Sequence, residues 1–305
     1  MHQVTSEGIT KTYDKGKSFA VDKVTFEVDK GELFGLIGPD GAGKTSLFRI
    51  LTTLLLPDEG KAAVNGYDVV TDYKKIRNVV GYMPGRFSLY PDLTVEENLN
   101  FFASVFGTTA QENYHLIKDM YSQIEPFKKR KAGNLSGGMK QKLALSCALV
   151  HRPNTLFLDE PTTGIDAVSR AELWEMLTKL KAEGITILVS TPYMDEANLC
   201  DRIALIQRGR ILSIDTPSSV TRKYKGKLYA AKSQSMYRLL EEIRKYDQTQ
   251  DCYAFGDSLH FTLKDDSGNG IESLSDFLTA STHFSFDLRE IEPTIEDCFI
   301  GLLRE

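Results

Sequence analysis

The sequence predicts an α/β fold followed by a small α+β region. The α/β prediction rests on apolar runs that alternate with segments of helical spacing. A continuous apolar run at 33–37 leads into a glycine-rich loop, and residues with helical spacing follow the loop. Further apolar runs at 155–158 and 185–189 are typical of interior parallel strands. Residues 93–150, which lie between these parts, have mostly helical character. We therefore expect a parallel sheet with a helical insertion.

The elements before the insertion are predicted to be strands, a turn and one helix. Strands are expected at 9–13 and at 20–28, where apolar residues alternate. The dipeptide Lys30-Gly31 is typical of a tight turn before the run at 33–37. The helix after the glycine-rich loop is expected to have an apolar face made of Leu47, Ile50, Leu51 and Leu54.

Within the insertion, helices are predicted near 95–106, 114–124 and 136–150. The α/β alternation then returns, and it ends with short strands at 203–207 and 210–214. We expect the main domain to cover residues 1–220, with its helical subdomain at about 93–150.

Residues 222–305 are predicted to form a separate small α+β domain. A helical face at 236–243 precedes a hairpin that turns at Gly256-Asp257. A helix, a strand and a final helix are then expected from three groups of apolar residues, namely Leu274, Phe277 and Leu278, then Phe284, Phe286 and Leu288, and finally Ile295, Phe299, Leu302 and Leu303.

Composition places the chain among ordinary globular proteins and gives no sign of a nucleic-acid partner. Apolar residues make up 41% and charged residues 26%, and the formal net charge is -5. The basic run at 128–131 is expected to be a solvated loop. The 4 cysteines have no short pairing interval, so reduced thiols are expected. Neither a signal segment nor a long apolar run occurs, which predicts a cytoplasmic protein.

The glycine-rich loop carries the most specific motif. Residues 38–45 fit the pattern G-x-x-x-x-G-K-[ST] in full, and a predicted strand and helix flank them as this motif requires. The backbone N–H groups of such a loop cradle phosphates, its lysine reaches the β- and γ-phosphates, and its hydroxyl residue holds Mg²⁺. We therefore predict binding of ATP and Mg²⁺ by Gly38, Pro39, Asp40, Gly41, Ala42, Gly43, Lys44, Thr45 and Ser46, with Lys44 also catalytic and Thr45 also a metal ligand.

A second motif supplies carboxylates. The apolar strand at 155–158 ends in Asp159 and Glu160. A carboxylate at that end of a strand is suited to hold Mg²⁺, usually through water, and we assign this role to Asp159. Glu160 follows it and is predicted to orient or deprotonate the attacking water. Taken alone, this pattern is weak, and it gains weight because a P-loop precedes it.

A third motif, Leu135-Ser136-Gly137-Gly138-Met139-Lys140-Gln141, opens the last inserted helix, with Ser136 as its N-cap. Physical reasoning alone favours a capped helix start. With the P-loop and the Asp-Glu strand in order, however, the chain resembles the ATP-binding subunit of an ABC transporter over residues 3 to about 220. The resemblance implies the ABC-type N-terminal β subdomain of a P-loop NTPase. It also implies that Ser136, Gly137 and Gly138 bind the γ-phosphate held by a second, head-to-tail ATP-binding domain.

Further roles follow from the resemblance. Tyr13 lies where the family stacks an aromatic ring on adenine, although an ordinary tyrosine at a strand end fits nearly as well. Residues 163–166 match the family's D-loop, so Asp166 is expected at the dimer seam. Residues 86–93 lie where such proteins contact an integral membrane permease, or else they pack the helical subdomain. The permease would hold the protein peripherally at the inner face of the cell membrane.

The chain departs from the family's pattern at two positions. Gly85 stands where a glutamine is usual, and Pro192 where a histidine is usual. Losing one preorganised polar contact of this kind costs about 3–4 kcal/mol, or roughly 10²–10³ in rate. We therefore expect ATP binding to survive and hydrolysis by the chain's own site to be weakened.

The first hypothesis is an energy-coupling ATPase of the multidrug-export type, paired with a separate permease. It acts as a homodimer or with a more complete second ATP-binding domain. The alternative is a soluble regulatory or scaffolding ABC protein that uses ATP binding as a switch. A plain P-loop kinase is disfavoured by the Ser136 motif.

Overall fold

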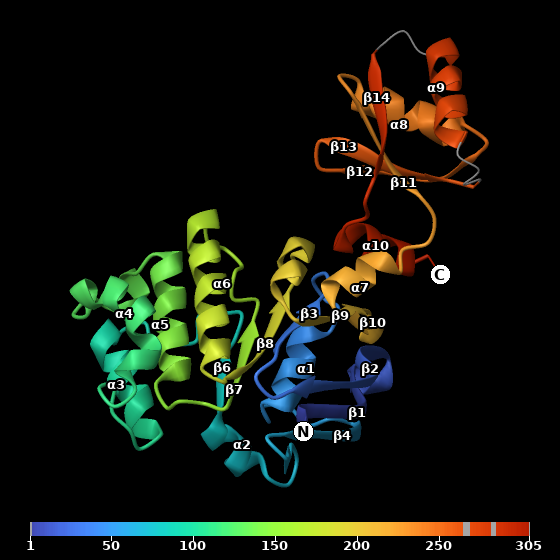
Figure 1. Cartoon of the computed structure of the whole chain (residues 1–305). Helices are drawn as coiled ribbons and strands as arrows, with labels where there is room; N and C mark the ends of the chain where they lie inside the picture. The colour runs from blue at the N-terminus through green and yellow to red at the C-terminus, as the bar shows by residue number, and fades with distance from the viewer. Residues whose placement is uncertain (1, 265–268, 282–284, 305) are drawn as a thin grey trace. The chain divides into compact units, whose positions relative to one another are not determined.

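The computed structural model describes residues 2–264, 269–281 and 285–304. It divides into two compact units, residues 1–220 and 221–305 (Figure 1). Each unit is described by itself.

The first unit contains an antiparallel sheet in the order β2-β1-β4-β5. It consists of β1 (His2–Tyr13), β2 (Ser18–Asp29), β4 (Glu59–Val64) and β5 (Tyr67–Asp68). Strands β1 and β2 start before the predicted ranges because their register shifts at several bulges, which interrupt the simple alternation. The inward faces of these strands contribute Val4, Ile9, Val21, Val24 and Val28 to the core of the unit.

The second sheet of this unit has the order β10-β9-β3-β8-β7-β6 and places the site. Its parallel strands are β3 (Leu33–Ile37), β6 (Val80–Met83), β7 (Thr155–Asp159), β8 (Thr186–Thr191) and β9 (Arg202–Gln207), and β10 (Arg210–Asp215) pairs antiparallel with β9. Strands β3, β7 and β8 are buried along their whole length, which explains their continuous apolar sequence. The carboxyl ends of β3, β8, β7 and β6 meet at one edge, where α/β sheets bind ligands.

Helices complete the first unit. They are α1 (Lys44–Leu51), α2 (Tyr73–Val79), α3 (Val95–Val105), α4 (Tyr114–Ile124), α5 (Gly137–Leu149), α6 (Ala167–Ala182) and α7 (Pro217–Arg222), which crosses the boundary between the units. Figure 1 shows α3, α4 and α5 gathered to one side, with α6 between them and the sheet. The prediction that Leu54 continues the face of α1 is wrong. The helix ends at Leu51, Thr53 has a φ of 63°, and the Leu54 side chain is exposed.

The second unit has the βαββαβ order of ferredoxin-like folds. Its elements are β11 (Leu228–Ser233), α8 (Met236–Lys245), β12 (Thr249–Phe255), β13 (Ser258–Leu263), α9 (Gly270–Ser281), β14 (Phe286–Ile291) and the added α10 (Ile295–Leu302). The strands pair antiparallel in the order β12-β13-β11-β14, and α8 and α9 pack on one face around Leu239, Phe261 and Leu274. Phe284, predicted in the last strand, lies outside the described residues.

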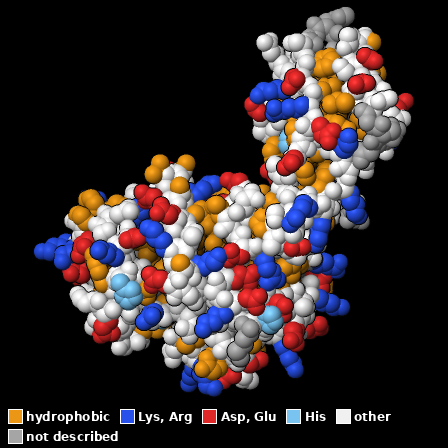
Figure 2. Space-filling view, viewed as in Figure 1, with side chains coloured by type: hydrophobic (Ala, Val, Ile, Leu, Met, Phe, Trp, Pro, Cys, Tyr) orange, Lys and Arg blue, Asp and Glu red, His pale blue; other side chains and the backbone are white. Residues whose placement is uncertain are grey.

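Acidic and basic side chains are interspersed over the face shown in Figure 2. Within the described residues, no helix combines the length and apolar character that a membrane span requires.

Candidate functional site

The glycine-rich loop joins β3 to α1 with its backbone pressed against neighbouring chain segments. Gly43 has a φ of 106°, and a Cβ there would lie 2.0 Å from the Ala20 carbonyl oxygen. A Cβ on Gly38 would lie 2.1 Å from the Ile206 carbonyl oxygen. Any other residue at these positions would displace backbone, so the two glycines fix the path of the loop.

The rest of the loop is tied down at its base and open at its tip. The Ala42 side chain is buried, its amide donates to the Pro39 carbonyl at 3.2 Å, and its carbonyl accepts from Gly209 at 2.9 Å. Asp40 and Gly41 are exposed at the tip. Within the described structure, no side chain caps α1 at Gly43, and its first turn holds no acidic residue. The first turn of α1 therefore leaves its backbone amides without a side-chain cap, and the positive end of the helix suits a phosphate.

Lys44 lies buried in the mouth of this loop. Its Nζ donates to the carbonyl oxygens of Gly38 at 2.8 Å and Pro39 at 3.1 Å. The same Nζ lies 3.2 Å from Glu160 Oε1, whose side chain is 23% exposed. The ammonium group thus sits between the loop and the carboxylate that the sequence predicts as catalytic. A phosphate in the loop would find this charge in place.

Asp159 ends β7 beside β8 and is 2% exposed. Its Oδ1 accepts a hydrogen bond from Ser190 Oγ at 2.6 Å. Thr45 is half-buried in the first turn of α1. A buried carboxylate and a hydroxyl are the oxygen donors that Mg²⁺ prefers, so these residues fit the predicted ion in chemical type.

Glu160 has a left-handed backbone conformation, with φ of 51°, which is strained for a residue with a side chain. Its amide donates to Ser190 at both the carbonyl oxygen, at 2.9 Å, and Oγ, at 3.1 Å. Residue 190 therefore holds the turn at which the chain leaves β7. The sequence reasoning missed Ser190, because only the register of two parallel strands brings it opposite Asp159.

Gly85 and Pro192 lie at the same sheet edge. A Cβ on Gly85 would be 3.1 Å from the Asp159 carbonyl oxygen and 3.7 Å from Glu160 Cβ. Pro192 follows Thr191, whose carbonyl accepts a hydrogen bond from the Gly38 amide at 3.2 Å. Both departures from the family's pattern are therefore next to the loop and the acids, and neither residue offers a polar side chain there.

Tyr13 and Ser46 meet beside the loop. Tyr13 ends β1 with its side chain exposed, and its hydroxyl is 3.4 Å from Ser46 Oγ on α1. The exposed ring next to α1 offers a surface on which a planar base could stack.

The Ser136 motif opens α5 as predicted, with Ser136 Oγ accepting from the Met139 amide at 3.4 Å. Ser136 and Gly137 are exposed. A Cβ on Gly137 would be 3.4 Å from the Gly164 carbonyl oxygen, and one on Gly138 would be 3.1 Å from Ser169 Oγ. The motif therefore lies beside the 163–166 segment of the same chain, and Asp166 caps α6 there by accepting from the Ser169 amide at 3.0 Å.

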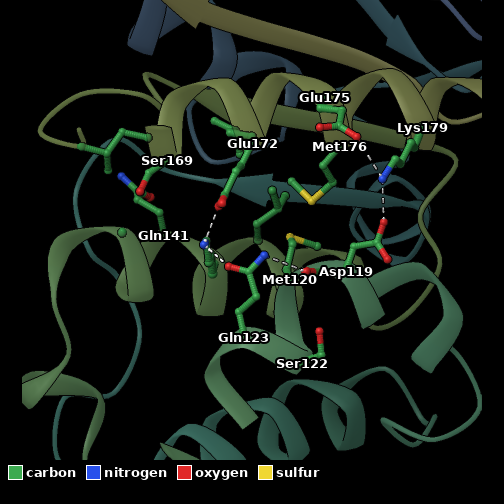
Figure 3. A pocket seen from close by; sticks show the side chains of 15 residues that line it. Asp119, Met120, Ser122, Gln123, Gln141, Ser169, Glu172, Glu175, Met176 and Lys179 are labelled. Atoms are coloured by element: carbon green, nitrogen blue, oxygen red, sulfur yellow. Dashed lines mark hydrogen bonds and ion pairs between the residues drawn. The ribbon is translucent and has the colours of Figure 1, made fainter. Parts of the chain in front are cut away.

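A cleft of about 420 Å³ continues from this point between α4, α5 and α6 (Figure 3). Ion pairs cross it from α6. Glu172 lies 2.7 Å from Lys142 of α5, and Lys179 lies 3.0 Å from Asp119 of α4. These contacts join the helical subdomain to the helix that follows the acids.

Glu196 forms a buried polar cluster behind the site that sequence reasoning did not find. Its Oε2 accepts from Thr191 Oγ1 at 2.5 Å and from Thr162 Oγ1 at 3.1 Å. Its Oε1 lies 3.6 Å from Arg170 Nε. The cluster connects the segment after β8, the segment after Glu160 and α6, and it is built from residues whose spacing in sequence gives no sign of contact.

A second cleft, of about 460 Å³ and largely apolar, lies beside the segment 86–93. Leu89 and Phe106 line it together with His151, whose ring stacks on Phe106 at 3.7 Å. Phe87 and Tyr90 of the same segment are exposed, while Leu89 is buried.

Comparison with known proteins identifies the family. Residues 21–163 match the family described as "ABC transporter". The chain is 39% identical over 305 residues to YbhF, a probable multidrug ABC transporter ATP-binding protein of Escherichia coli K12. The match covers 98% of this chain and 52% of that protein. It is 42% identical over 212 residues to the Nod factor export ATP-binding protein I of Burkholderia pseudomallei K96243, covering 68% of this chain and 69% of that protein. The chain thus spans about half the length of the first relative.

Solved structures agree with these relatives. An ATP-binding subunit of an ABC transporter is similar with a TM-score of 0.66 and 28% identity, covering 72% of this chain and 92% of that chain. The dimeric post-hydrolysis state of the ATP-binding cassette MJ0796, bound to ADP and Pi, is similar with a TM-score of 0.64 and 26% identity, covering 70% and 98%. The chain therefore belongs to the ABC transporter family, and its first unit is an ABC ATPase domain with the P-loop NTPase fold.

Proposed function

We propose that the chain binds and hydrolyses ATP to drive an export system, acting as a head-to-tail dimer on a separate membrane permease. The observation that carries this proposal is the meeting of Lys44, Asp159 and Glu160 at the sheet edge beside the glycine-rich loop. The printed names of the relatives, which concern multidrug transport and Nod factor export, support export as the direction.

In this proposal each residue has a defined task. The loop amides and Lys44 bind the phosphates of ATP, and Thr45 with Asp159 holds the ion. Bound Mg²⁺ supplies charge neutralisation at the phosphates. Glu160 orients the attacking water and accepts its proton, and Tyr13 stacks on the base.

The chain's own nucleotide site, at its P-loop, is proposed to be catalytically degenerate. Gly85 and Pro192 place no side-chain donor or acceptor beside the acids and the loop, so the transition state loses preorganised contacts. The exposed start of α5 at Ser136–Gly138 is complete, in contrast, and is proposed to close on the nucleotide of a second ATP-binding domain. That domain is either a second copy or a more complete partner.

The permease is proposed to dock at the segment 86–93 and the apolar cleft beside it. The exposed rings of Phe87 and Tyr90 provide apolar contact area at this surface. Such docking would hold the chain at the inner face of the cell membrane.

The test measures ATP turnover by the purified chain and by Gly85→Gln and Pro192→His. Wild-type turnover should be slow, and the double variant should raise it by about 10²-fold or more. A Cβ at position 85 requires a shift of a few tenths of an ångström at Asp159, so Pro192→His is the cleaner single change. Rapid wild-type turnover that neither variant alters would contradict the degenerate site.

A pull-down from detergent-solubilised membranes tests the partner. Recovery of an integral membrane protein supports the transport role. Reproducible recovery of soluble proteins alone favours the regulatory ABC alternative.

A further inference from the structure

Ser190 lies where the proposed site's two acids meet, yet it has no role in the functions described so far. It sits near the end of β8, is 0% exposed, and is the register partner of Asp159 in β7. Its hydroxyl donates to Asp159 Oδ1 at 2.6 Å and accepts from the Glu160 amide at 3.1 Å.

The hydroxyl therefore acts on both acids at once. Its O–H fixes one oxygen of the Asp159 carboxylate, which restricts rotation of that carboxylate about its last bond. Its lone pair, with the Ser190 carbonyl, holds the Glu160 amide while Glu160 keeps its left-handed φ of 51°. Losing the hydroxyl would free the carboxylate and weaken the hold on the strained turn.

Neighbouring hydroxyls on the same strand are used differently. Thr186 Oγ1 accepts from the Gly31 amide at 2.8 Å at the opposite end of β8, and Thr191 Oγ1 donates to Glu196 at 2.5 Å. Among these β8 hydroxyls, the contacts of Ser190 are the ones made to the proposed metal and catalytic residues.

We propose that Ser190 is a positioning residue that orients Asp159 toward the nucleotide-bound metal and Glu160 toward the water. The proposal rests on the proposed nucleotide site. Residues that orient a metal-binding carboxylate are worth about 10–100-fold in metal affinity.

The experiment titrates Mn²⁺ into the full chain with a non-hydrolysable ATP analogue and follows bound Mn²⁺ by electron paramagnetic resonance. Ser190→Ala should weaken Mn²⁺ binding by about 10-fold or more. Its affinity for the analogue in EDTA should change less than about two-fold, because the P-loop contacts are intact. Ser190→Thr, which keeps the hydroxyl, should restore Mn²⁺ affinity.

Thr186→Val is the matched control, since it removes a buried hydroxyl from the same strand at its other end. It should leave Mn²⁺ affinity unchanged. If Ser190→Ala unfolds, Ser190→Cys, of similar size with a weak donor, replaces it and should show the same loss. Unchanged Mn²⁺ affinity in the folded variant overturns the role of Ser190. A wild-type chain that binds no analogue overturns the proposed function instead.

Discussion

Asp159 in the first unit and Asp297 in the second are both buried aspartates that accept a hydrogen bond from a hydroxyl group. Asp297 accepts from His260 Nδ1 at 2.7 Å, Tyr253 Oη at 2.8 Å, and Thr294 through Oγ1 at 2.7 Å and its amide at 2.8 Å. Both of its oxygens are thus bonded to groups of the same unit, with Thr294 and Asp297 forming a capping box at α10.

Asp159 lies among groups of another kind. Lys44 at this sheet edge is bonded to loop carbonyls and to the partly buried Glu160, and the Glu160 turn is strained. The comparison teaches that burial of a carboxylate does not by itself mark a reactive site. A cluster whose polar groups all have hydrogen-bond partners stabilises the fold. A site with strained backbone and a buried cation beside an open loop is suited to bind a ligand.

The largest expected effect is on the satisfied cluster. Asp297→Ala should lower the free energy of unfolding of the second unit by about 3–5 kcal/mol, because its buried donors lose their acceptor. Circular dichroism in urea should show an early transition. Fluorescence of Trp174, the single tryptophan, reports on α6 of the first unit and should keep its midpoint. Equal loss at both probes would contradict a defect confined to the second unit.

The same cluster fixes a pH dependence. Burial raises the pKa of Asp297, but hydrogen bonds from His260, Thr294 and Tyr253 outweigh it and hold the pKa below its ordinary value. A depressed pKa contributes stability above the unfolded-state value of about 3.9, and the contribution is lost as pH falls through the folded-state value. The Asp297 cluster should therefore persist to about pH 4.

The first unit should begin to lose stability on acidification at a higher pH than the second unit, because of His151. Burial lowers the pKa of this ring to about 4, while its hydrogen bond to the Val80 carbonyl, at 3.0 Å, acts in the opposite sense. The unfolded chain binds the proton below about pH 6.5, so stability falls by about 3 kcal/mol as pH drops from there to about 4. His151→Gln should flatten this slope in urea titrations followed by Trp174 fluorescence. An identical slope in the variant would assign the loss to other groups.

Lys44→Ala tests the other region of the comparison, the proposed nucleotide site around Asp159 and Glu160. Removing the cation should weaken ATP binding about 10–100-fold, since a charge-assisted phosphate contact is worth about 1.5–3 kcal/mol. The fold should remain, because the contacts of the Lys44 ammonium group are with the loop carbonyls and Glu160 and not with the hydrophobic core. Lys75→Ala, which removes an exposed lysine paired with Asp72, is the charge-matched control for calorimetric ATP titrations.

The sequence predicted the parts of the site that local pattern encodes. The strand 33–37 and the helix 114–124 have the predicted bounds, because each is set by its own apolar spacing and neighbouring turn residues. Gly85 and Pro192 could be singled out from the family's motif order. Their closeness to Asp159 and Gly38 arises because parallel strands end at one edge.

What sequence could not supply is contact between strands. The placement of β3 between β8 and β9, the register that sets Ser190 opposite Asp159, and the Glu196 cluster all depend on pairing across distant segments. The exposed Leu54 shows that a local pattern can also extend an element too far. Its spacing fits the helical pattern, but α1 ends at Leu51 and Thr53 is left-handed, so the backbone conformation after the helix overrides the pattern.

The weakest expected effect concerns the ion pairs across the α4–α5–α6 cleft, where solvent competes with both partners. Lys142 and Glu172 lie 2.7 Å apart with side chains 21% and 44% exposed. A double-mutant cycle with Lys142→Ala and Glu172→Ala, followed by Trp174 fluorescence in urea, should give a coupling of about 0.2–1 kcal/mol. The coupling should shrink in 1 M salt because screening shortens the range of the attraction. A coupling above about 2 kcal/mol that salt leaves unchanged would show that this pair behaves like the buried polar cluster around Asp297. Solvent screening would then not explain the difference between the two.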